Sequence, residues 1–219
     1  MEKKYKLTEE YTTIGGKKLY RIEALKDFSD VKKGDKGGFV ESKDNLSQYN
    51  NCWVHDDAIV YSSAKICDNA IIYGDARVFG NAKVYGKAIV HGDSEICDDT
   101  IICGKANISN ADINGNAKVA STSDYIVFKN WWSSGRYFTW TRSNNMWSVG
   151  CFYGTGEELI AKAYKDSELS GREYKRVVKY VESIINEDRN YDTRRQRTLS
   201  QRPLCKVAIR YCLPSRIQK

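Results

Sequence analysis

The chain has 219 residues and a mass of 25.0 kDa, enough for one elongated domain and one small one. Lys and Arg number 35 against 28 Asp and Glu, so the formal net charge is +7, and most of the excess falls in residues 186–219. No apolar run is long enough to span a bilayer, and the charged start MEKKYKLTEE lacks a signal-peptide hydrophobic stretch. These features argue against membrane and secreted proteins and predict a cytoplasmic one.

Cysteine usage agrees with that prediction. The seven cysteines are odd in number and contain no CxxC pair, which favours reduced thiols over a disulfide framework or a zinc site. We therefore predict no metal and no cofactor. The cysteines are Cys52, Cys67, Cys97, Cys103, Cys151, Cys205 and Cys212.

Residues 1–39 are predicted to form a cap on the β-structure of residues 40–120. The stretch YTTIGGKKLYRIEAL is typical of a hairpin that turns at Gly15 and Gly16, and KKGDKGG indicates a second turn. A cap is needed because an uncovered end of a β-structure exposes strand edges that invite polymerisation.

A six-residue repeat fills most of residues 40–120. In the unit that begins at Ala76, Ala76 and Val78 point inward and Arg77 points outward, while Gly80 and Asn81 favour a corner with positive φ. Upstream, Val40, Leu46 and Cys52 continue the phase of the small position through a less regular first coil, and Cys52 takes the place of a core alanine. Downstream, the repeat that begins at Ala106 is one residue short. The small positions are Ala58, Ala64, Ala70, Ala76, Ala82, Ala88, Ser94, Thr100 and Ala106, and a β-branched aliphatic lies two residues after each.

This repeat resembles the hexapeptide-repeat superfamily, whose fold is a left-handed parallel β-helix with three hexapeptides in each triangular coil. The resemblance implies a mainly β fold with four to five coils. The A-x-V-Y-G-N/D units and the preceding YRIEALKDF segment also resemble short hexapeptide proteins of bacteriophages and prophages. That likeness implies a small accessory protein in the host bacterial cytoplasm, which binds a host protein or signal.

An acyltransferase is the alternative that the superfamily offers, because members of that branch use a histidine at a coil corner as general base. The chain has two histidines, His55 and His91, which lie two coils apart in the family's geometry and form an outward column with Tyr73 between them. Neighbouring rings in such a column are predicted to lie about 4.8 Å apart. The transferases tend to carry a loop that breaks the repeat, and nothing is inserted between Ala58 and Ala106. The missing loop argues against an enzyme.

Residues 121–186 are predicted to form an aromatic-rich α+β domain. The stretches DYIVFKNWW, RYFTWTR and MWSVGCFYG indicate three strands. Two helices come next, since Thr155 with Glu158 and Ser170 with Glu173 have the spacing of capping boxes. The second helix carries one apolar stripe, composed of Tyr174, Val177, Val178, Val181, Ile184 and Ile185.

Strand alternation in this domain places four residues on one side of the sheet and three on the other. The first set is Arg136, Phe138, Trp140 and Arg142, and the second is Tyr137, Thr139 and Thr141. Trp beside Arg suits stacking on a ring and pairing with a phosphate or carboxylate, if that face of the sheet is uncovered. The opposing interpretation makes the tryptophans core or a dimer surface. The candidate binding residues are Trp131, Trp132, Arg136, Tyr137, Trp140, Arg142 and Trp147.

Residues 187–219 form a basic tail, in which RNYDTRRQR could attract nucleic acid or another anion or could simply be solvated. Ladders of equivalent side chains on the flat faces of the solenoid predict a homo-oligomer, with a trimer favoured over a dimer. The sequence as a whole predicts a non-catalytic binding protein that recognises a host protein or a small anionic, nucleotide-like ligand and counteracts host defence. An acyltransferase that uses His91 or His55 and a purely structural spacer remain the alternatives.

Overall fold

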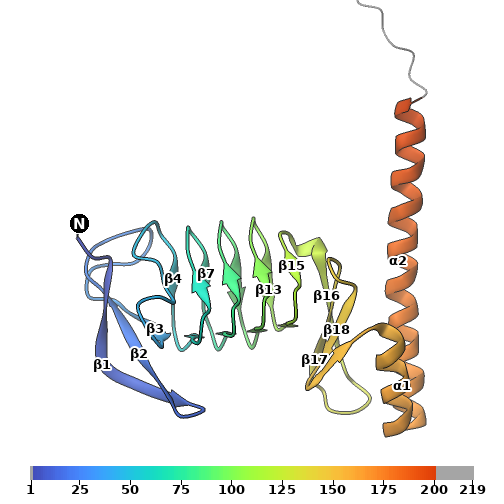
Figure 1. Cartoon of the computed structure of the whole chain (residues 1–219), viewed down its shortest axis with the longest axis horizontal. Coiled ribbons are helices and arrows are strands. Elements are labelled where there is room, and N and C mark those ends of the chain that lie inside the picture. The colour runs from blue at the N-terminus through green and yellow to red at the C-terminus, as the bar shows by residue number, and fades with distance from the viewer. Residues whose placement is uncertain (1, 201–219) are drawn as a thin grey trace, which may run out of the picture. The chain divides into compact units, whose positions relative to one another are not determined.

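The computed structural model describes residues 2–200 and divides the chain into two compact units, residues 1–175 and residues 176–219. The first unit holds an N-terminal hairpin, a solenoid, a four-stranded sheet, one helix and the start of a second (Figure 1). That second helix, α2, spans Glu168–Ser200 and so crosses the predicted start of the basic tail at residue 187. The remainder of the predicted tail, residues 201–219, lies outside the described residues. No helix in the described part of the chain is long and apolar enough to cross a membrane.

The N-terminal hairpin forms as predicted. Strand β1, Tyr5–Ile14, pairs antiparallel with β2, Lys17–Ala24, and the two turn residues Gly15 and Gly16 have φ values of 54° and 79°. Positive φ at both positions gives the turn the twist that matches the strands. Strand β3, Lys36–Val40, pairs with β2 on one side and with the solenoid strand β5, Ile59–Val60, on the other, so it leads the hairpin's sheet into the solenoid.

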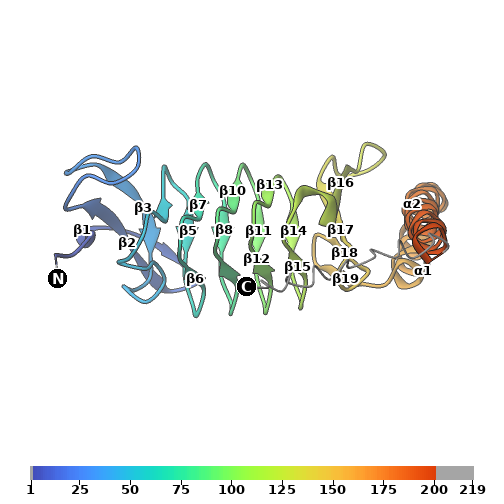
Figure 2. The ribbon, with the colours of Figure 1, turned by 90° about the horizontal axis from the view of Figure 1, so that it is seen from above.

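The solenoid is the mainly β, left-handed parallel β-helix that the repeat predicts, with about four turns (Figures 1 and 2). Strands three repeats apart pair in parallel, giving the orders β3-β5-β8-β11-β14, β4-β7-β10-β13 and β6-β9-β12-β15. The strands are β4 Trp53–Val54, β5 Ile59–Val60, β6 Lys65–Ile66, β7 Ile71–Ile72, β8 Arg77–Val78, β9 Lys83–Val84, β10 Ile89–His91, β11 Glu95–Ile96, β12 Ile101–Ile102, β13 Asn107–Ser109, β14 Asp112–Ile113 and β15 Lys118–Val119.

The pairing register shows where the repeat departs from eighteen residues per coil. Ile89 pairs with Asn107, 18 residues on, whereas Glu95 pairs with Asp112, only 17 residues on, which confirms the missing residue in the repeat that begins at Ala106. In the first coil, Val40 pairs with Val60, 20 residues on. The phase predicted for Val40 and Leu46 was therefore wrong, because two extra residues shift both into the aliphatic position. Cys52 does occupy a buried small position.

The corners need positive φ at one position, not two. Gly80 has a φ of 66°, but the next position, which Asn81 represents, shows no positive φ in any described repeat, so that part of the prediction was wrong. Where an aspartate replaces the glycine it adopts the same conformation and bonds to the next coil. Asp98, with a φ of 56°, accepts a hydrogen bond from the Gly115 N–H through Oδ2 at 2.9 Å.

At the N-terminal end of the solenoid, several backbone carbonyls have no preceding coil that could donate hydrogen bonds to them. Many bonds between coils run from an N–H group to a carbonyl of the next coil, as from Ile89 to Ala106, so several carbonyls of the first coil have no donor in a preceding coil. The hairpin supplies donors for them. The buried Lys4 ammonium donates to the carbonyl of Cys52 at 2.8 Å, and the Tyr5 hydroxyl donates to that of Leu46 at 2.7 Å.

At the C-terminal end, some N–H groups of the last coil, such as those of Asp112 and Lys118, have no further coil to which they can donate. The segment after the solenoid supplies acceptors. Thr139 Oγ1 accepts from the Asp112 N–H at 3.2 Å, and Ser143 Oγ accepts from the Lys118 N–H at 2.7 Å. Asp124, at the end of a short 3-10 helix at Thr122–Asp124, accepts from the N–H of Ala120 at 2.8 Å. The C-terminal sheet thus closes the solenoid.

The C-terminal sheet has four antiparallel strands in the order β16-β17-β18-β19, where the sequence predicted three. They are β16 Tyr125–Lys129, β17 Tyr137–Thr141, β18 Met146–Val149 and β19 Phe152–Gly154. The third predicted strand splits because Gly150, with a φ of 56°, turns the chain back on itself.

The helices also differ from the prediction in one detail. Helix α1, Gly156–Asp166, begins with the predicted capping box, in which Thr155 Oγ1 accepts from the Glu158 N–H. Helix α2 begins two residues before Ser170, and Ser167 Oγ accepts the Ser170 N–H at 3.1 Å. The second predicted capping box was therefore wrong.

Both faces of the sheet are covered, and this determines which of its aromatic residues are buried. The Thr139 face lies on the last coil, as its hydrogen bond shows. On the other face, Phe138 packs edge-on against Tyr174 at a centroid distance of 5.2 Å, and Trp140 and Trp147 are only 1% and 2% exposed. The expectation that Trp140 lies on an uncovered face was wrong, because α1 and the first residues of α2, up to Tyr174, cover the side opposite the solenoid.

Candidate functional site

The structure separates the seven predicted binding residues into two groups. Trp140 and Trp147 are core residues, and Trp132 is half-buried. Trp131, at 73% exposed, Tyr137, at 38%, Arg136 and Arg142 lie at the surface. Arg142 lies over the Trp140 ring at 5.7 Å from its centroid and donates from Nε to the carbonyl of Ser123 at 3.2 Å. Arg136 and Tyr137 are the two that share a concave surface.

That surface, here called the arginine groove, lies between the last coils and the C-terminal sheet and has a volume of about 580 Å³. Arg77 and Glu95, on neighbouring coils, form an ion pair at 3.2 Å within it. Burial and the nearby Glu95 carboxylate raise the pKa of Asp112 to about 6, against the opposing effect of Arg136. The lining residues are Asp75, Arg77, Asp93, Glu95, Asn110, Asp112, Gly135, Arg136, Tyr137, Gly150 and Cys151.

A smaller cavity of about 220 Å³, here called the Asn130 pocket, adjoins the groove and shares Arg136, Tyr137, Gly150 and Cys151 with it. Its other lining residues are Asn130, Ser134, Val149, Phe152, Lys162 and Tyr174. The groove has four carboxylates to two guanidinium groups, whereas the lining of the pocket has two cations, Arg136 and Lys162, and no carboxylate. The combined surface is therefore acidic in the arginine groove, where the carboxylates come from the solenoid, and basic in the Asn130 pocket.

The sequence did not indicate three residues of this pocket. Asn130 and Lys162 carry no motif, and Tyr174 was assigned to the apolar stripe of its helix. Tyr174 does pack as that stripe predicts, against Trp132 at 5.0 Å and Phe138 at 5.2 Å between ring centroids. Its hydroxyl nevertheless reaches the Asn130 amide across 44 residues of sequence, a contact that no local pattern encodes.

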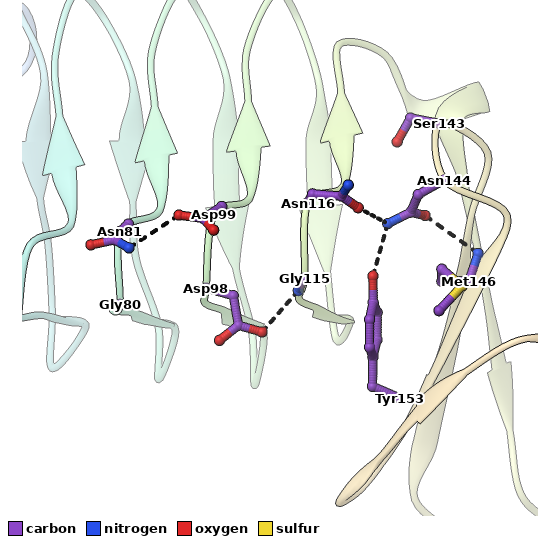
Figure 3. Close-up of a pocket in the computed structure, with 10 residues that line it drawn as sticks. All are labelled: Gly80, Asn81, Asp98, Asp99, Gly115, Asn116, Ser143, Asn144, Met146 and Tyr153. Atoms are coloured by element: carbon purple, nitrogen blue, oxygen red, sulfur yellow. Dashed lines mark hydrogen bonds between the residues drawn. The ribbon is translucent and has the colours of Figure 1, made fainter.

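A third hollow of about 940 Å³ lies where the corners of the last coils meet the sheet (Figure 3). Its polar side chains bond to one another. Asn144 donates to Asn116 at 3.2 Å and to the Tyr153 hydroxyl at 3.1 Å, and Asp99 accepts from Asn81 at 3.0 Å. A side chain at Gly115 would overlap Tyr153, so the sheet and the solenoid fit closely there. We interpret this hollow as the seam between the solenoid and the sheet.

The two histidines belong to the outward column that the sequence predicts. The rings of Tyr73 and His91 stack at 4.7 Å with an angle of 4° between their planes, close to the predicted coil spacing. His91 Nε2 lies 3.0 Å from Asn107 Oδ1. His55 and His91 line none of the three concave surfaces described above.

The groups that most often bind metals do not come together in the described part of the chain. No cluster of three or more His, Cys, Asp or Glu side chains is arranged there to hold a metal ion. The five described cysteines are free, and Cys151, at the edge of the arginine groove, is exposed.

Among curated proteins, one short match bears on the fold. No family model matches the chain. A protein of Escherichia coli strain K12, named uncharacterized acetyltransferase YdcK, is 40% identical over 62 residues. The match covers 25% of this chain and 19% of that protein, so the chain spans less than a fifth of the relative. Together with the β-helix, the match supports a relationship to the hexapeptide-repeat superfamily.

Proposed function

We propose that the chain is a non-catalytic binding protein of a bacteriophage or mobile element, which recognises a host protein or a small anionic, nucleotide-like ligand. The observation that carries the proposal is that Arg136 and Tyr137 both line the arginine groove. A groove lined by an exposed ring and a guanidinium suits a ligand that has both an aromatic ring and an anionic group. Sequestering such a signal would counteract a host defence that depends on it.

The position of the histidines and the regularity of the repeat both speak against catalysis. A general base must lie within hydrogen-bond reach of the proton that it removes. His91 stacks on Tyr73 in an outward ladder, away from the three concave surfaces, and the repeat runs from β5 to β13 at its regular spacing.

The test is calorimetric titration of the full chain with linear and cyclic adenine nucleotides. A charge-assisted hydrogen bond contributes about 1.5–3 kcal/mol, so Arg136→Gln should weaken binding roughly 10- to 100-fold. The loss should shrink as salt rises, because screening already weakens the charged contact. Lys87→Gln is the matched control, since Lys87 is exposed on the solenoid and lies outside the groove. Equal affinity in the Arg136 variant and the wild type would refute the recognition site.

An acyltransferase is the second candidate, and the short match to a protein named as an acetyltransferase favours it. In that function His91 Nδ1 would act as general base, with the ring oriented by its Nε2–H, which donates to Asn107 Oδ1 at 3.0 Å. The test is turnover of acetyl-CoA with amine and hydroxyl acceptors. Turnover that disappears in His91→Ala, while the variant stays folded, would replace the binding proposal with this one.

A further inference from the structure

The loop between β16 and β17 holds an unexplained pair of buried polar atoms. Among the described residues, two buried side-chain atoms lack a hydrogen-bond partner, Asn130 Oδ1 and Trp132 Nε1, and both belong to this loop. Buried polar groups in proteins almost always have partners, because leaving one unpaired costs about 1–3 kcal/mol. Asn130 is 6% exposed and lines the Asn130 pocket, whereas Trp132 does not, so Asn130 is the one of the two that a ligand in this pocket would contact.

The Asn130 side chain is fixed in place without satisfying that oxygen. Its backbone N–H donates to the carbonyl of Arg136 at 2.8 Å, which closes the loop, and its Nδ2 donates to the Tyr174 hydroxyl at 2.9 Å. Turning the amide over would satisfy Oδ1 from Tyr174 and leave Nδ2 unpaired instead. One end of the amide therefore needs a partner in either orientation, and the Tyr174 ring is held by packing against Trp132 and Phe138.

Charge and size limit what that partner is. Arg136 and Lys162 both line the pocket, and neither forms an ion pair within 4.0 Å among the described residues. Two cations in a lining that holds no carboxylate favour an anionic group. At about 220 Å³, the cavity is smaller than the roughly 300–1,000 Å³ of a site for a drug-sized ligand, so it holds a few heavy atoms and not a whole nucleotide.

We infer that the Asn130 pocket binds the anionic end of a small molecule, a carboxylate or a phosphate that has an N–H or O–H donor beside it. Arg136 and Lys162 hold the anionic oxygens, and Asn130 Oδ1 accepts the neighbouring donor. This inference rests on the proposed binding function and deepens it, because it specifies which part of the ligand enters the pocket.

The experiment is an NMR titration of the full chain that monitors the backbone amides of Gly135, Gly150 and Cys151. The probes are glycolate, acetate, inorganic phosphate and the uncharged acetamide. We expect glycolate to bind more tightly than acetate, which has no donor, and acetamide not to bind. Inorganic phosphate separates the two sources of the anion, since a phosphate site would prefer it to glycolate.

Two variants and a control locate the site. Lys162→Gln should weaken binding of the preferred probe by about tenfold or more, because it removes a charged donor. Tyr174→Phe keeps the ring but removes the hydroxyl that orients Asn130, and it should reduce the preference for glycolate over acetate. Lys165→Gln, on the same helix but outside the pocket lining, should leave both unchanged.

Three results would overturn the inference: no shift of these amides with any probe at tens of millimolar, equal binding of acetamide and glycolate, or an equal loss in the Lys162 and Lys165 variants. The outcome is separable from that of the proposed function. Nucleotide binding that depends on Arg136 but not on Lys162 or Tyr174 would retain the proposed function and discard this pocket.

Discussion

Replacing Thr139 by valine tests how the C-terminal sheet closes the solenoid. Thr139 is fully buried, and its Oγ1 accepts the Asp112 N–H at 3.2 Å. Valine has nearly the same shape but cannot accept a hydrogen bond, so the Asp112 N–H loses its partner. Leaving a buried donor unpaired costs about 1–3 kcal/mol. Because this bond is long and only partly buried, we expect the lower end, about 1 kcal/mol.

Stability alone cannot identify the cause, since Thr139→Ser, the matched control, also loses about 0.8 kcal/mol with its methyl group. The two variants differ in whether the Asp112 amide keeps an acceptor: serine still provides a hydroxyl, and valine does not. Native-state hydrogen exchange of the Asp112 amide should be about five- to tenfold faster in the valine variant, the equivalent of about 1–1.4 kcal/mol, and close to wild type in the serine variant. Urea unfolding provides the global free energy for both.

The exchange rates decide between two explanations. An Asp112 amide that is equally protected in the valine variant and the wild type would show that the hydroxyl does not cap the last coil. Equal acceleration in the serine and valine variants would assign the protection to the packing of the methyl group.

Core packing, a raised pKa, a tight corner and the oligomeric state can each be tested separately. Trp140→Ala should lower the free energy of unfolding by about 3–5 kcal/mol, measured in urea, while ligand affinity of the folded fraction stays the same, because the indole is core. The raised pKa of Asp112, about 6 against 3.8, means that the folded state binds the proton more tightly, so stability falls as pH rises between about 4 and 6. Asp112→Asn should therefore be more stable than wild type above pH 6 and equal to it below pH 4 in urea titrations, and a constant difference would contradict this. Gly80→Ala should be more destabilising than Gly15→Ala in thermal melts, since both have positive φ but only a Cβ at Gly80 meets backbone, at 2.7 Å from Asp98 N. Light scattering should return a multiple of 25.0 kDa, with a trimer favoured, and a mass near that of one chain would exclude the oligomer.

The solenoid could be predicted almost completely, because every repeat has the same local environment. The alternation that places Ala76 and Val78 inside recurs at each unit, and even the short repeat after Ala106 was visible as a lost residue. The first coil was less regular. Its two extra residues are taken up before Ala58, and the sequence alone offered no means to tell which of Val40 or its neighbours would pair with Val60.

The C-terminal sheet shows where such prediction ends. Alternation correctly put Thr139 on the side opposite Phe138 and Trp140, but it could not tell which side faced a partner element. That depends on docking, here decided by acceptors for the unpaired N–H groups of the last coil. The Asn130 pocket could not be predicted for the same reason, since Asn130 and Tyr174 come into contact only when the start of α2 packs on the sheet.

The two ends of the solenoid differ in chemistry, which gives the solenoid a direction. Lys4 and Tyr5 donate at one end, whereas Thr139 and Ser143 accept at the other, so neither cap could serve in the place of its counterpart. A chain without the hairpin would leave the carbonyls of Cys52 and Leu46 without these donors, and a chain without the sheet would leave the N–H groups of Asp112 and Lys118 without these acceptors. The two truncated chains would therefore expose different unpaired backbone groups at their open ends.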